Sequence, residues 1–276
     1  MGWNQHDRAQ ARQSCSSAVP VSRRRICWLL MLGACIRSLL MSQPIPIFIG
    51  YDARERAATN VLIDSLYQHS SAPLAITPIV TPQLEAQGIF HRQRDPKQST
   101  DFSFTRFLVP YLIDYRGWAI FMDCDMLCRA DIAELWTLRD ERWALMCIQH
   151  EHVPNERVKF LGEVQSPYPK KNWSSLMLMN GSRCTALTPE YVNSASGLDL
   201  HRFHWLADDG EIGALPDRWN HLVDVQASPE LSSDDGGPCL LHWTLGGPWF
   251  REQRTMGGAL AAEWFSARDD ALRLWE

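Results

Sequence analysis

The chain has 276 residues, of which 45% are hydrophobic and 21% are charged, and its formal net charge at pH 7 is -5. This composition is that of a globular protein with a core of its own, and one α/β domain is the simplest expectation. Acidic and basic residues are interspersed, which excludes a long basic track for nucleic acid. The cysteines form no C-x-x-C pair, and an odd number of them, five, lie after residue 43, which favours a reducing compartment over a disulfide framework.

Residues 1–43 differ from the rest of the chain. Several arginines precede an apolar run over residues 26–36, which resembles a signal-anchor, although the run is short for crossing a bilayer. Alternatively, Met41 is the true start and the upstream segment is a gene-model extension or a disordered tail. We therefore expect an N-terminal extension over residues 1–43 and a domain over residues 44–276. The expected location is cytoplasmic, with membrane association through the extension left open.

A strand, a loop and a helix open the domain. Residues 45–49 are apolar and lead into Gly50-Tyr51-Asp52, and residues 55–69 carry apolar side chains at helical spacing. Residues 74–80 predict a second strand, and Pro78 favours an edge position for it. Residues 81–101 are polar and contain glycine and proline, which predicts a loop able to close over a ligand.

Residues 103–115 predict a helix with an apolar stripe. Pro110 lies inside this pattern and predicts a kink or a late start. Arg106 falls off the stripe, so it is either a solvated surface charge or an anion-binding side chain. We favour anion binding, because the helix leads directly into the central strand.

The rest of the chain is organised around residues 118–128. Five apolar residues run without alternation to Asp123 and Asp125, which predicts a strand buried on both faces that ends in two carboxylates. Burying an unpaired carboxylate is very costly, so both are expected at the carboxyl edge of the sheet, where α/β sheets bind ligands. Such oxygen ligands suit Mg²⁺ or Mn²⁺. In the plainer interpretation one Asp caps the next helix and the other lies in solvent.

Strands and helices alternate in the second half of the domain. Helices are predicted over residues 131–138 and 198–206, and strands over residues 143–149 and 173–180. Residues 150–171 show no periodicity and predict a loop. Its last residues, Lys170 and Lys171, are either solvated or offered to phosphate or to an acceptor.

The last predicted strand contains His242. A lone histidine is usually a satisfied core residue, but a glycine-proline turn over residues 246–249 follows at once, and its bare backbone can approach a ligand closely. This neighbourhood favours a ligand role for His242. A final amphipathic helix is predicted over residues 258–274, packed on the outside.

Five of these motifs occur in the order seen in the GT-A glycosyltransferases. They are Gly50-Tyr51-Asp52, Ser103-Phe-Thr-Arg106, Asp123-Cys-Asp125, Leu215-Pro-Asp-Arg-Trp-Asn220 and His242-Trp-Thr-Leu-Gly-Gly-Pro-Trp249. The chain resembles this group over about residues 44–250, and within it the glycosyltransferase family 8 and glycogenin-like enzymes. The resemblance implies a single α/β domain of the GT-A fold, with a mixed central sheet flanked by helices.

The resemblance also implies an activity. The enzyme would be of the hexosyltransferase type, moving a sugar with retention from a nucleotide-diphosphate donor, usually a UDP-sugar, to the hydroxyl of a glycan, lipid or small molecule. A Mn²⁺ or Mg²⁺ cofactor would be held by Asp123, Asp125 and His242. The implied donor-binding residues are Tyr51, Asp52, Arg106, Asp123, Cys124, Gly247 and Trp249. The implied catalytic acids beneath the sugar are Asp208, Asp209 and Glu211, which the plainer interpretation leaves as an exposed helix terminus.

Two features depart from the pattern of the group. Trp173-Ser174-Ser175 stands where many relatives have Asn-Ser-Gly or Asn-Ala-Gly, so sugar and acceptor contacts are expected to differ there. Arg251 follows the last motif where relatives often carry a lysine, and an arginine differs from a lysine in shape.

Two other functions compete with sugar transfer. Haloacid-dehalogenase-like phosphatases also use an apolar strand that ends in Asp-x-Asp, with the first Asp as nucleophile. They carry the motif on their first strand and a Thr or Val where this chain has Leu127, which disfavours this alternative. The other is a non-catalytic domain that binds nucleotide-sugars.

Overall fold

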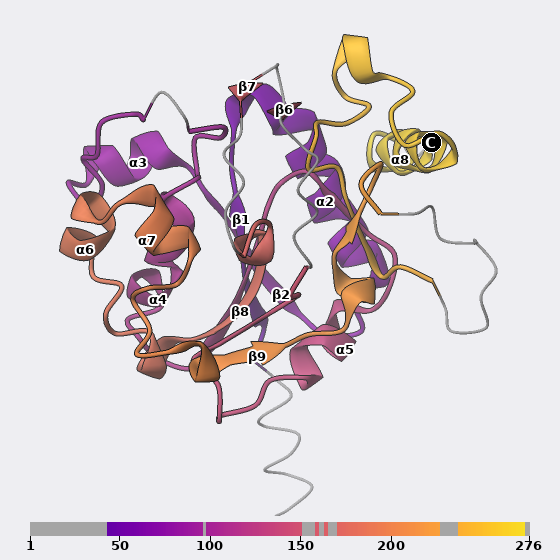
Figure 1. Ribbon diagram of the computed structural model, residues 1–276. Coiled ribbons are helices and arrows are strands. Elements are labelled where there is room, and N and C mark those ends of the chain that lie inside the picture. The colour runs from indigo at the N-terminus through magenta and orange to yellow at the C-terminus, as the bar shows by residue number, and fades with distance from the viewer. Residues whose placement is uncertain are drawn as a thin grey trace, which may run out of the picture. The chain divides into compact units, whose positions relative to one another are not determined.

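The computed structural model describes residues 43–95, 98–150, 158–159, 163–164, 170–226 and 237–273 (Figure 1). The predicted N-terminal extension lies outside these ranges except for residue 43, and it stays a prediction. Within the described ranges, no helix has the length and apolar character needed to cross a membrane.

A mixed sheet forms the centre of the domain, with strand order β2-β1-β3-β8-β5-β9. Its strands are β1 (Ile45–Gly50), β2 (Leu74–Ile79), β3 (Trp118–Met122), β5 (Leu145–Cys147), β8 (Leu176–Asn180) and β9 (Ile212–Ala214). Strand β1 is parallel to β2 and β3, β8 is antiparallel to β3 and β5, and β5 is parallel to β9. The ends of β1, β3, β5 and β9 therefore meet the start of β8 at one edge of the sheet, called here the carboxyl edge.

A smaller sheet in the order β10-β11-β4 continues from this edge. It contains β4 (Met126–Cys128), β10 (His221–Leu222) and β11 (Leu240–His242). Strand β11 is antiparallel to β4 and parallel to β10. A pair of short antiparallel strands, β6 (Val158–Lys159) and β7 (Glu163–Val164), lies within the predicted 150–171 loop.

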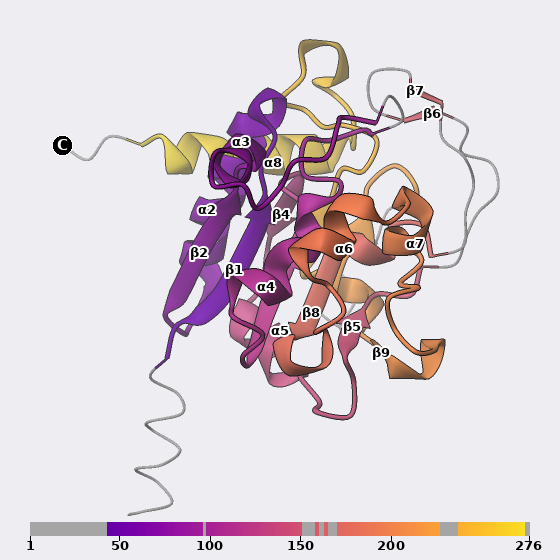
Figure 2. The ribbon, with the colours of Figure 1, turned by 90° about the vertical axis from the view of Figure 1, so that its left-hand side faces the viewer.

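Helices cover both faces of the central sheet. They are α2 (Arg56–His69), α3 (Thr81–Ala86), α4 (Val109–Leu112), α5 (Ile132–Thr137), α6 (Pro189–Ser194), α7 (Gly197–His201) and α8 (Ala259–Ala271). Figure 1 shows α3, α4, α6 and α7 to the left of the central strands and α2, α5 and α8 to the right. In the turned view of Figure 2 the strands succeed one another from β2 to β9. This arrangement confirms the predicted α/β fold class.

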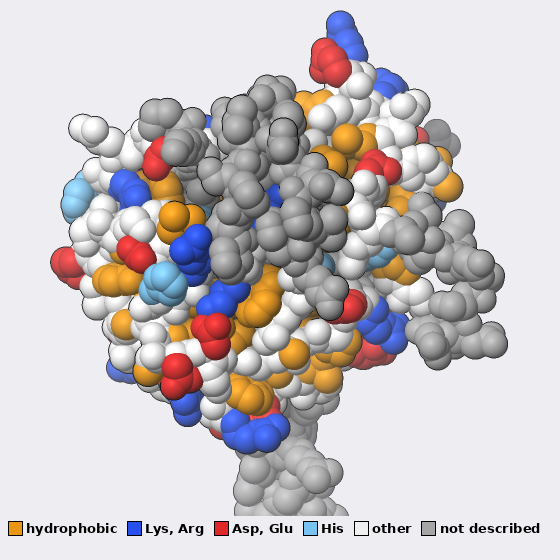
Figure 3. Space-filling model, viewed as in Figure 1, with side chains coloured by type: hydrophobic (Ala, Val, Ile, Leu, Met, Phe, Trp, Pro, Cys, Tyr) orange, Lys and Arg blue, Asp and Glu red, His pale blue; other side chains and the backbone are white. Residues whose placement is uncertain are grey.

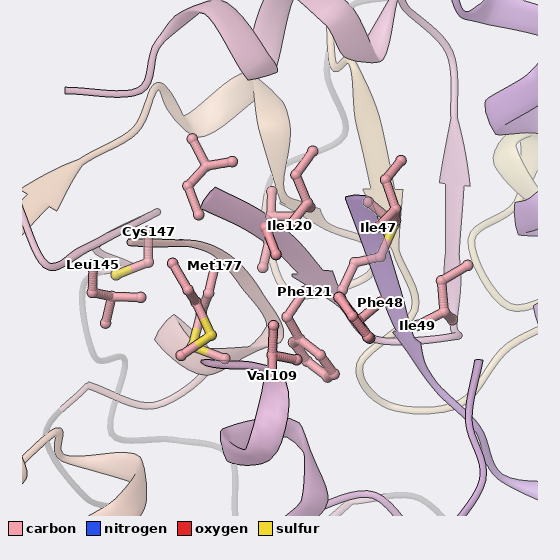
Figure 4. Close-up of a cluster of buried hydrophobic side chains, with 14 of the residues drawn as sticks. Ile47, Phe48, Ile49, Val109, Ile120, Phe121, Leu145, Cys147 and Met177 are labelled. Carbon is pink, nitrogen blue, oxygen red and sulfur yellow. The ribbon is translucent and has the colours of Figure 1, made fainter. Parts of the chain in front are cut away.

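The hydrophobic core is built around the apolar residues of the central strand, β3. All five residues of β3 are buried, which confirms a strand covered on both faces. Figure 4 shows Ile47 of β1, Ile120 and Phe121 of β3, and Met177 of β8 among the buried side chains. Strand β2 lies at the edge of the sheet, as Pro78 predicted, because proline cannot donate to a neighbouring strand.

The predicted helix over residues 103–115 is broken in two. A 3-10 turn, Thr105–Leu108, leads into α4, whose first turn contains Pro110. Proline needs no hydrogen-bond acceptor in a first turn but disrupts a helix interior, so the chain starts a new helix there. The 3-10 geometry also changes the direction of Arg106, which is buried with 5% exposure and is not the surface charge of the plainer interpretation.

Two short helices were missed by the sequence analysis. Helix α3 lies in the predicted loop over residues 81–101, and Pro82 occupies its first turn. Helix α6 carries a cap, since Thr188 accepts a hydrogen bond from the amide of Tyr191. Both helices had terminal signals, but each is only six residues long, which is too short for apolar periodicity to show.

Glu55 is a buried carboxyl just before α2. It is 3% exposed, and its Oε2 accepts a hydrogen bond of 3.2 Å from the thiol of Cys124. Burial first, and then the charge of Asp125, raise the pKa of Glu55 from 4.5 to about 8. The folded chain therefore keeps this proton at neutral pH, which removes one negative charge from the carboxyl edge.

We expect Glu55→Gln to remove a pH dependence of stability. Between pH 4.5 and about 8 the folded chain holds a proton that the unfolded chain releases, so the free energy of unfolding of the wild type falls as the pH rises. The slope reaches at most about 1.4 kcal/mol per pH unit. Urea denaturation with a metal chelator, from about pH 6.5 to about pH 8, should show this slope in the wild type and a flatter curve in the variant.

The matched control is Glu85→Gln, which changes an exposed glutamate on α3. It should keep the slope of the wild type. Parallel curves for the wild type and Glu55→Gln over this pH range would show that Glu55 ionises normally.

Candidate functional site

The two carboxylates of the Asp-x-Asp motif lie where the two sheets join. Asp123 follows β3, and its amide donates to the carbonyl of Ser175 at 2.9 Å. Asp125 precedes β4, and its carbonyl accepts from the amide of Trp243 at 2.9 Å. The backbone at each carboxylate is therefore tied to a segment far away in the sequence.

His242 lies beside these carboxylates because of the register between β11 and β4. His242 pairs with Met126, the residue after Asp125. One ligand atom from each of Asp123, Asp125 and His242 lies within 4.8 Å of the others. The structure therefore brings together the three predicted metal ligands.

The chemistry of this cluster fits a cation. Nε2 of His242 lies 3.3 Å from Oδ1 of Asp125, and the side chains are 1% and 13% exposed. Neither atom has a hydrogen-bond partner among the described residues. Buried polar atoms are normally partnered, so this nitrogen and this oxygen, facing each other without a hydrogen bond, suit the coordination of a metal ion with nitrogen and oxygen ligands.

Arg106 faces the other carboxylate. Its guanidinium lies 2.9 Å from Oδ1 of Asp123 and donates at 2.9 Å to the carbonyl of Ser174. It also lies 5.1 Å and 5.2 Å from the ring centroids of Phe102 and Phe121. The aromatic rings and the carboxylate together hold this cation at the carboxyl edge.

Asp52 has a structural role in the same region. Its carboxylate, with no exposed surface, accepts from the guanidinium of Arg54 at 2.6 Å and 3.0 Å and from the amide of Asp101 at 3.1 Å. Burial opposes its ionisation, but these hydrogen bonds outweigh burial and lower the pKa of Asp52 below its ordinary value. Tyr51, half-buried, follows β1 at the same edge. Donor binding by either residue stays a prediction.

Cys124 points away from the cluster, into the core. Its side chain has no exposed surface, and its thiol donates to Glu55. Burial and the neighbouring acidic groups raise the pKa of this thiol well above its ordinary value. Any contact of Cys124 with a ligand would therefore use its backbone.

The turn after His242 packs against the last helix. A Cβ on Gly247 would lie 2.3 Å from the indole of Trp249, so glycine is required there. The ring of Trp249 lies 6.1 Å from that of Trp243 and 5.4 Å from that of Trp264 on α8. These contacts position the turn, and donor binding by Gly247 and Trp249 stays a prediction. Arg251 is exposed just beyond the turn.

The three predicted acids are not among the residues of this cluster. Glu211 precedes β9, and its carbonyl accepts from the amide of Ala144 before β5, so it lies at the opposite end of the strands from Asp123. It pairs with Arg183 at 3.2 Å. Asp209 is 76% exposed and pairs with Lys170, and Asp208 accepts from the amide of Gly210. Their catalytic role stays a prediction.

His150 was missed by the sequence analysis. It follows β5 at the carboxyl edge, and its carbonyl accepts from the indole of Trp173 at 3.0 Å. Burial first, and then His242 and His221, lower the pKa of His150 to about 4, so its imidazole is neutral at pH 7. No local pattern marked it, because the predicted 150–171 loop begins at this residue.

Solved structures with similar folds include two glycosyltransferases. The glycosyltransferase GlyE of Streptococcus pneumoniae TIGR4 matches with a TM-score of 0.53 and 15% identity, over 84% of this chain and 61% of that chain. The galactosyltransferase LgtC, solved with donor and acceptor sugar analogs, matches with a TM-score of 0.51 and 10% identity, over 84% of this chain and 98% of that chain. At these identities the likeness shows the fold, which is that of the GT-A glycosyltransferases.

No protein family model matches the chain. A curated relative does: the chain is 46% identical to Protein CDI of Arabidopsis thaliana over 214 residues, which are 75% of this chain and 80% of that protein. This identity extends over most of both proteins. The chain therefore belongs to the family of Protein CDI and has a GT-A glycosyltransferase fold.

Proposed function

We propose that this protein is a metal-dependent glycosyltransferase that moves a sugar from a nucleotide-diphosphate donor to an acceptor hydroxyl. The cluster of Asp123, Asp125 and His242 at the carboxyl edge carries the proposal. This edge is where open α/β sheets bind ligands. The fold shared with GlyE and LgtC supports the reaction class.

The side chains at the edge suit a donor with a charged leaving group. A bound Mn²⁺ or Mg²⁺ supplies positive charge that stabilises the departing diphosphate. Arg106 is a second cation beside the cluster, held by Asp123 and two aromatic rings. The buried protein groups around it exclude water and hold these charges in place, so little reorganisation is needed during transfer.

The finer assignments rest on the resemblance of the motifs to glycosyltransferase family 8. They are a UDP-sugar as donor, retention of the anomeric configuration, and donor contacts from Tyr51, Asp52, Gly247 and Trp249. Positioning of the acceptor hydroxyl is the remaining requirement. His150 and Trp173 lie at the same edge and are available for that task.

A thermal-shift screen of nucleotide diphosphates and their sugars with Mn²⁺ tests the donor class, because a ligand that binds only the folded state raises the melting temperature. A UDP-sugar that is bound with Mn²⁺ and is then hydrolysed or transferred supports the proposal. Metal-dependent binding without turnover would instead support a non-catalytic binding domain. Trapping of an aluminium fluoride at Asp123 as an aspartyl-phosphate mimic would support a phosphatase.

We expect Asp125→Asn and His242→Gln each to raise the dissociation constant for Mn²⁺ by at least about 100-fold, because each removes one ligand of the cluster. Titration calorimetry with Mn²⁺ alone measures this change without a donor. Turnover of the donor should be lost in both variants. The control Asp269→Asn, on the exposed side of α8, should bind Mn²⁺ as the wild type does. Wild-type affinity in either cluster variant would remove that residue from the site.

We expect Arg106→Met to leave Asp123 as a buried charge without its guanidinium partner, since the two side chains are only 7% and 13% exposed. Without metal, the variant should be about 3 kcal/mol less stable than the wild type. Mn²⁺ should raise its melting temperature more than that of the wild type, because the ion replaces the lost positive charge. Urea and thermal denaturation measure both effects.

The double variant Arg106→Met/Asp123→Asn shows whether Arg106 stabilises the protein through its charge or through its packing. It removes the carboxylate charge along with the guanidinium, so it should be more stable than Arg106→Met in the absence of metal. Equal stability of the single and double variants would mean that Arg106 contributes packing rather than charge compensation.

A further inference from the structure

Three hydrogen bonds link His242 to the start of β8. Nδ1 of His242 lies 2.9 Å from Oδ1 of Asn220, and Nδ2 of Asn220 donates to Oγ of Ser175 at 2.8 Å. The hydroxyl of Ser175 donates to the carbonyl of Asn172 at 2.6 Å. The side chains of Asn220 and His242 are 0% and 1% exposed, so water does not compete with these bonds.

The direction of each proton follows from the last acceptor. A backbone carbonyl can only accept, so the Ser175 hydroxyl must donate to Asn172, and its oxygen accepts from Asn220. This contact assigns the amide nitrogen of Asn220 to the side of Ser175 and the amide oxygen to the side of His242. The amide oxygen only accepts, so Nδ1 of His242 carries the hydrogen.

The other ring nitrogen of His242 then holds a lone pair. A neutral imidazole has one N–H group, and Nδ1 has it. In the neutral ring, Nε2 therefore faces Asp125 as an acceptor, at 3.3 Å from Oδ1. This is the protonation state that a metal ligand requires, and ligating histidines are commonly oriented through their second nitrogen.

We propose that Asn220, held by Ser175, is a positioning residue that selects the metal-binding tautomer of His242 before any ion arrives. The inference rests on the proposed metal-dependent function. Asn220 does not contact the ion or the donor in this scheme, and it acts through His242. Its location at the end of the Leu215–Asn220 motif gives that motif a physical role: it brings an amide oxygen to the imidazole.

Two substitutions of Asn220 distinguish the effect of its amide oxygen on His242 from the effect of its packing. Asn220→Leu has a similar volume and no acceptor, so Nδ1 loses its partner and both tautomers become accessible. Asn220→Asp keeps an acceptor toward His242. The matched control is Asn180→Leu, because Asn180 is also a buried asparagine, with 2% exposure, but lies at the opposite end of β8 and donates to Glu141.

The first measurement uses no metal. In protein labelled with ¹⁵N-histidine at about pH 8, where an ordinary imidazole is neutral, long-range ¹H–¹⁵N spectra distinguish the two tautomers. The His242 signal is identified as the one missing from His242→Gln. The wild type, Asn220→Asp and Asn180→Leu should show the hydrogen on Nδ1, whereas Asn220→Leu should show Nε2–H or a mixture. A wild-type spectrum with the hydrogen on Nε2 would overturn the proposal.

The second measurement is calorimetry with Mn²⁺ alone. Asn220→Leu should raise the dissociation constant about 10-fold to 100-fold, whereas Asn220→Asp should match the wild type or bind more tightly, and Asn180→Leu should match it. Asn220→Leu binding as tightly as the wild type, or Asn220→Asp binding as weakly as Asn220→Leu, would overturn the positioning role. A wild type that does not bind Mn²⁺ would instead refute the proposed metal dependence, and the spectra would still report the tautomer.

Discussion

The burial of negative charge at the carboxyl edge of the central sheet is the constraint that organises this protein. Asp52, Glu55 and Asp125 are buried there, and Asp123 is nearly so. Burying an ionised carboxylate is costly unless a proton, a cation or several hydrogen bonds compensate it. Asp52, Glu55 and Asp123 each meet this requirement in a different way, whereas Oδ1 of Asp125 has no hydrogen-bond partner among the described residues.

Three of these acids have a proton, a cation or hydrogen bonds from the protein, and the fourth, Asp125, is the one left to face the proposed metal ion. Arg54 and backbone amides hold Asp52, a retained proton neutralises Glu55, and Arg106 faces Asp123. Asp125 instead faces an imidazole nitrogen. On the described part of the face in Figure 3, acidic, basic and hydrophobic side chains are interspersed. Several buried charged groups close together are typical of a site that binds a ligand.

Much of the fold and part of the site follow from local patterns. The unbroken apolar run of residues 118–122 predicted a buried strand, helical periodicity predicted α2, and Pro78 predicted an edge strand. Short elements escaped, because a six-residue helix has too few turns to show a period. The position of Glu211 could not be predicted for a related reason: the direction of β9, which puts Glu211 at the end of the strands opposite Asp123, depends on pairing with β5.

By itself, the sequence determined that an apolar strand ends in two carboxylates and that a histidine lies in a late strand, since these are properties of neighbouring residues. The tertiary structure decided how these groups are used. Asn220 hydrogen-bonds to Ser175 and to His242, which lie 45 and 22 residues away along the chain. These two hydrogen bonds can form only when the chain is folded. The burial of Glu55 against Cys124, 69 residues away, likewise depends on packing. Protonation states and tautomers are set by such long-range contacts, because they depend on which atoms approach within about 3 Å in the folded chain.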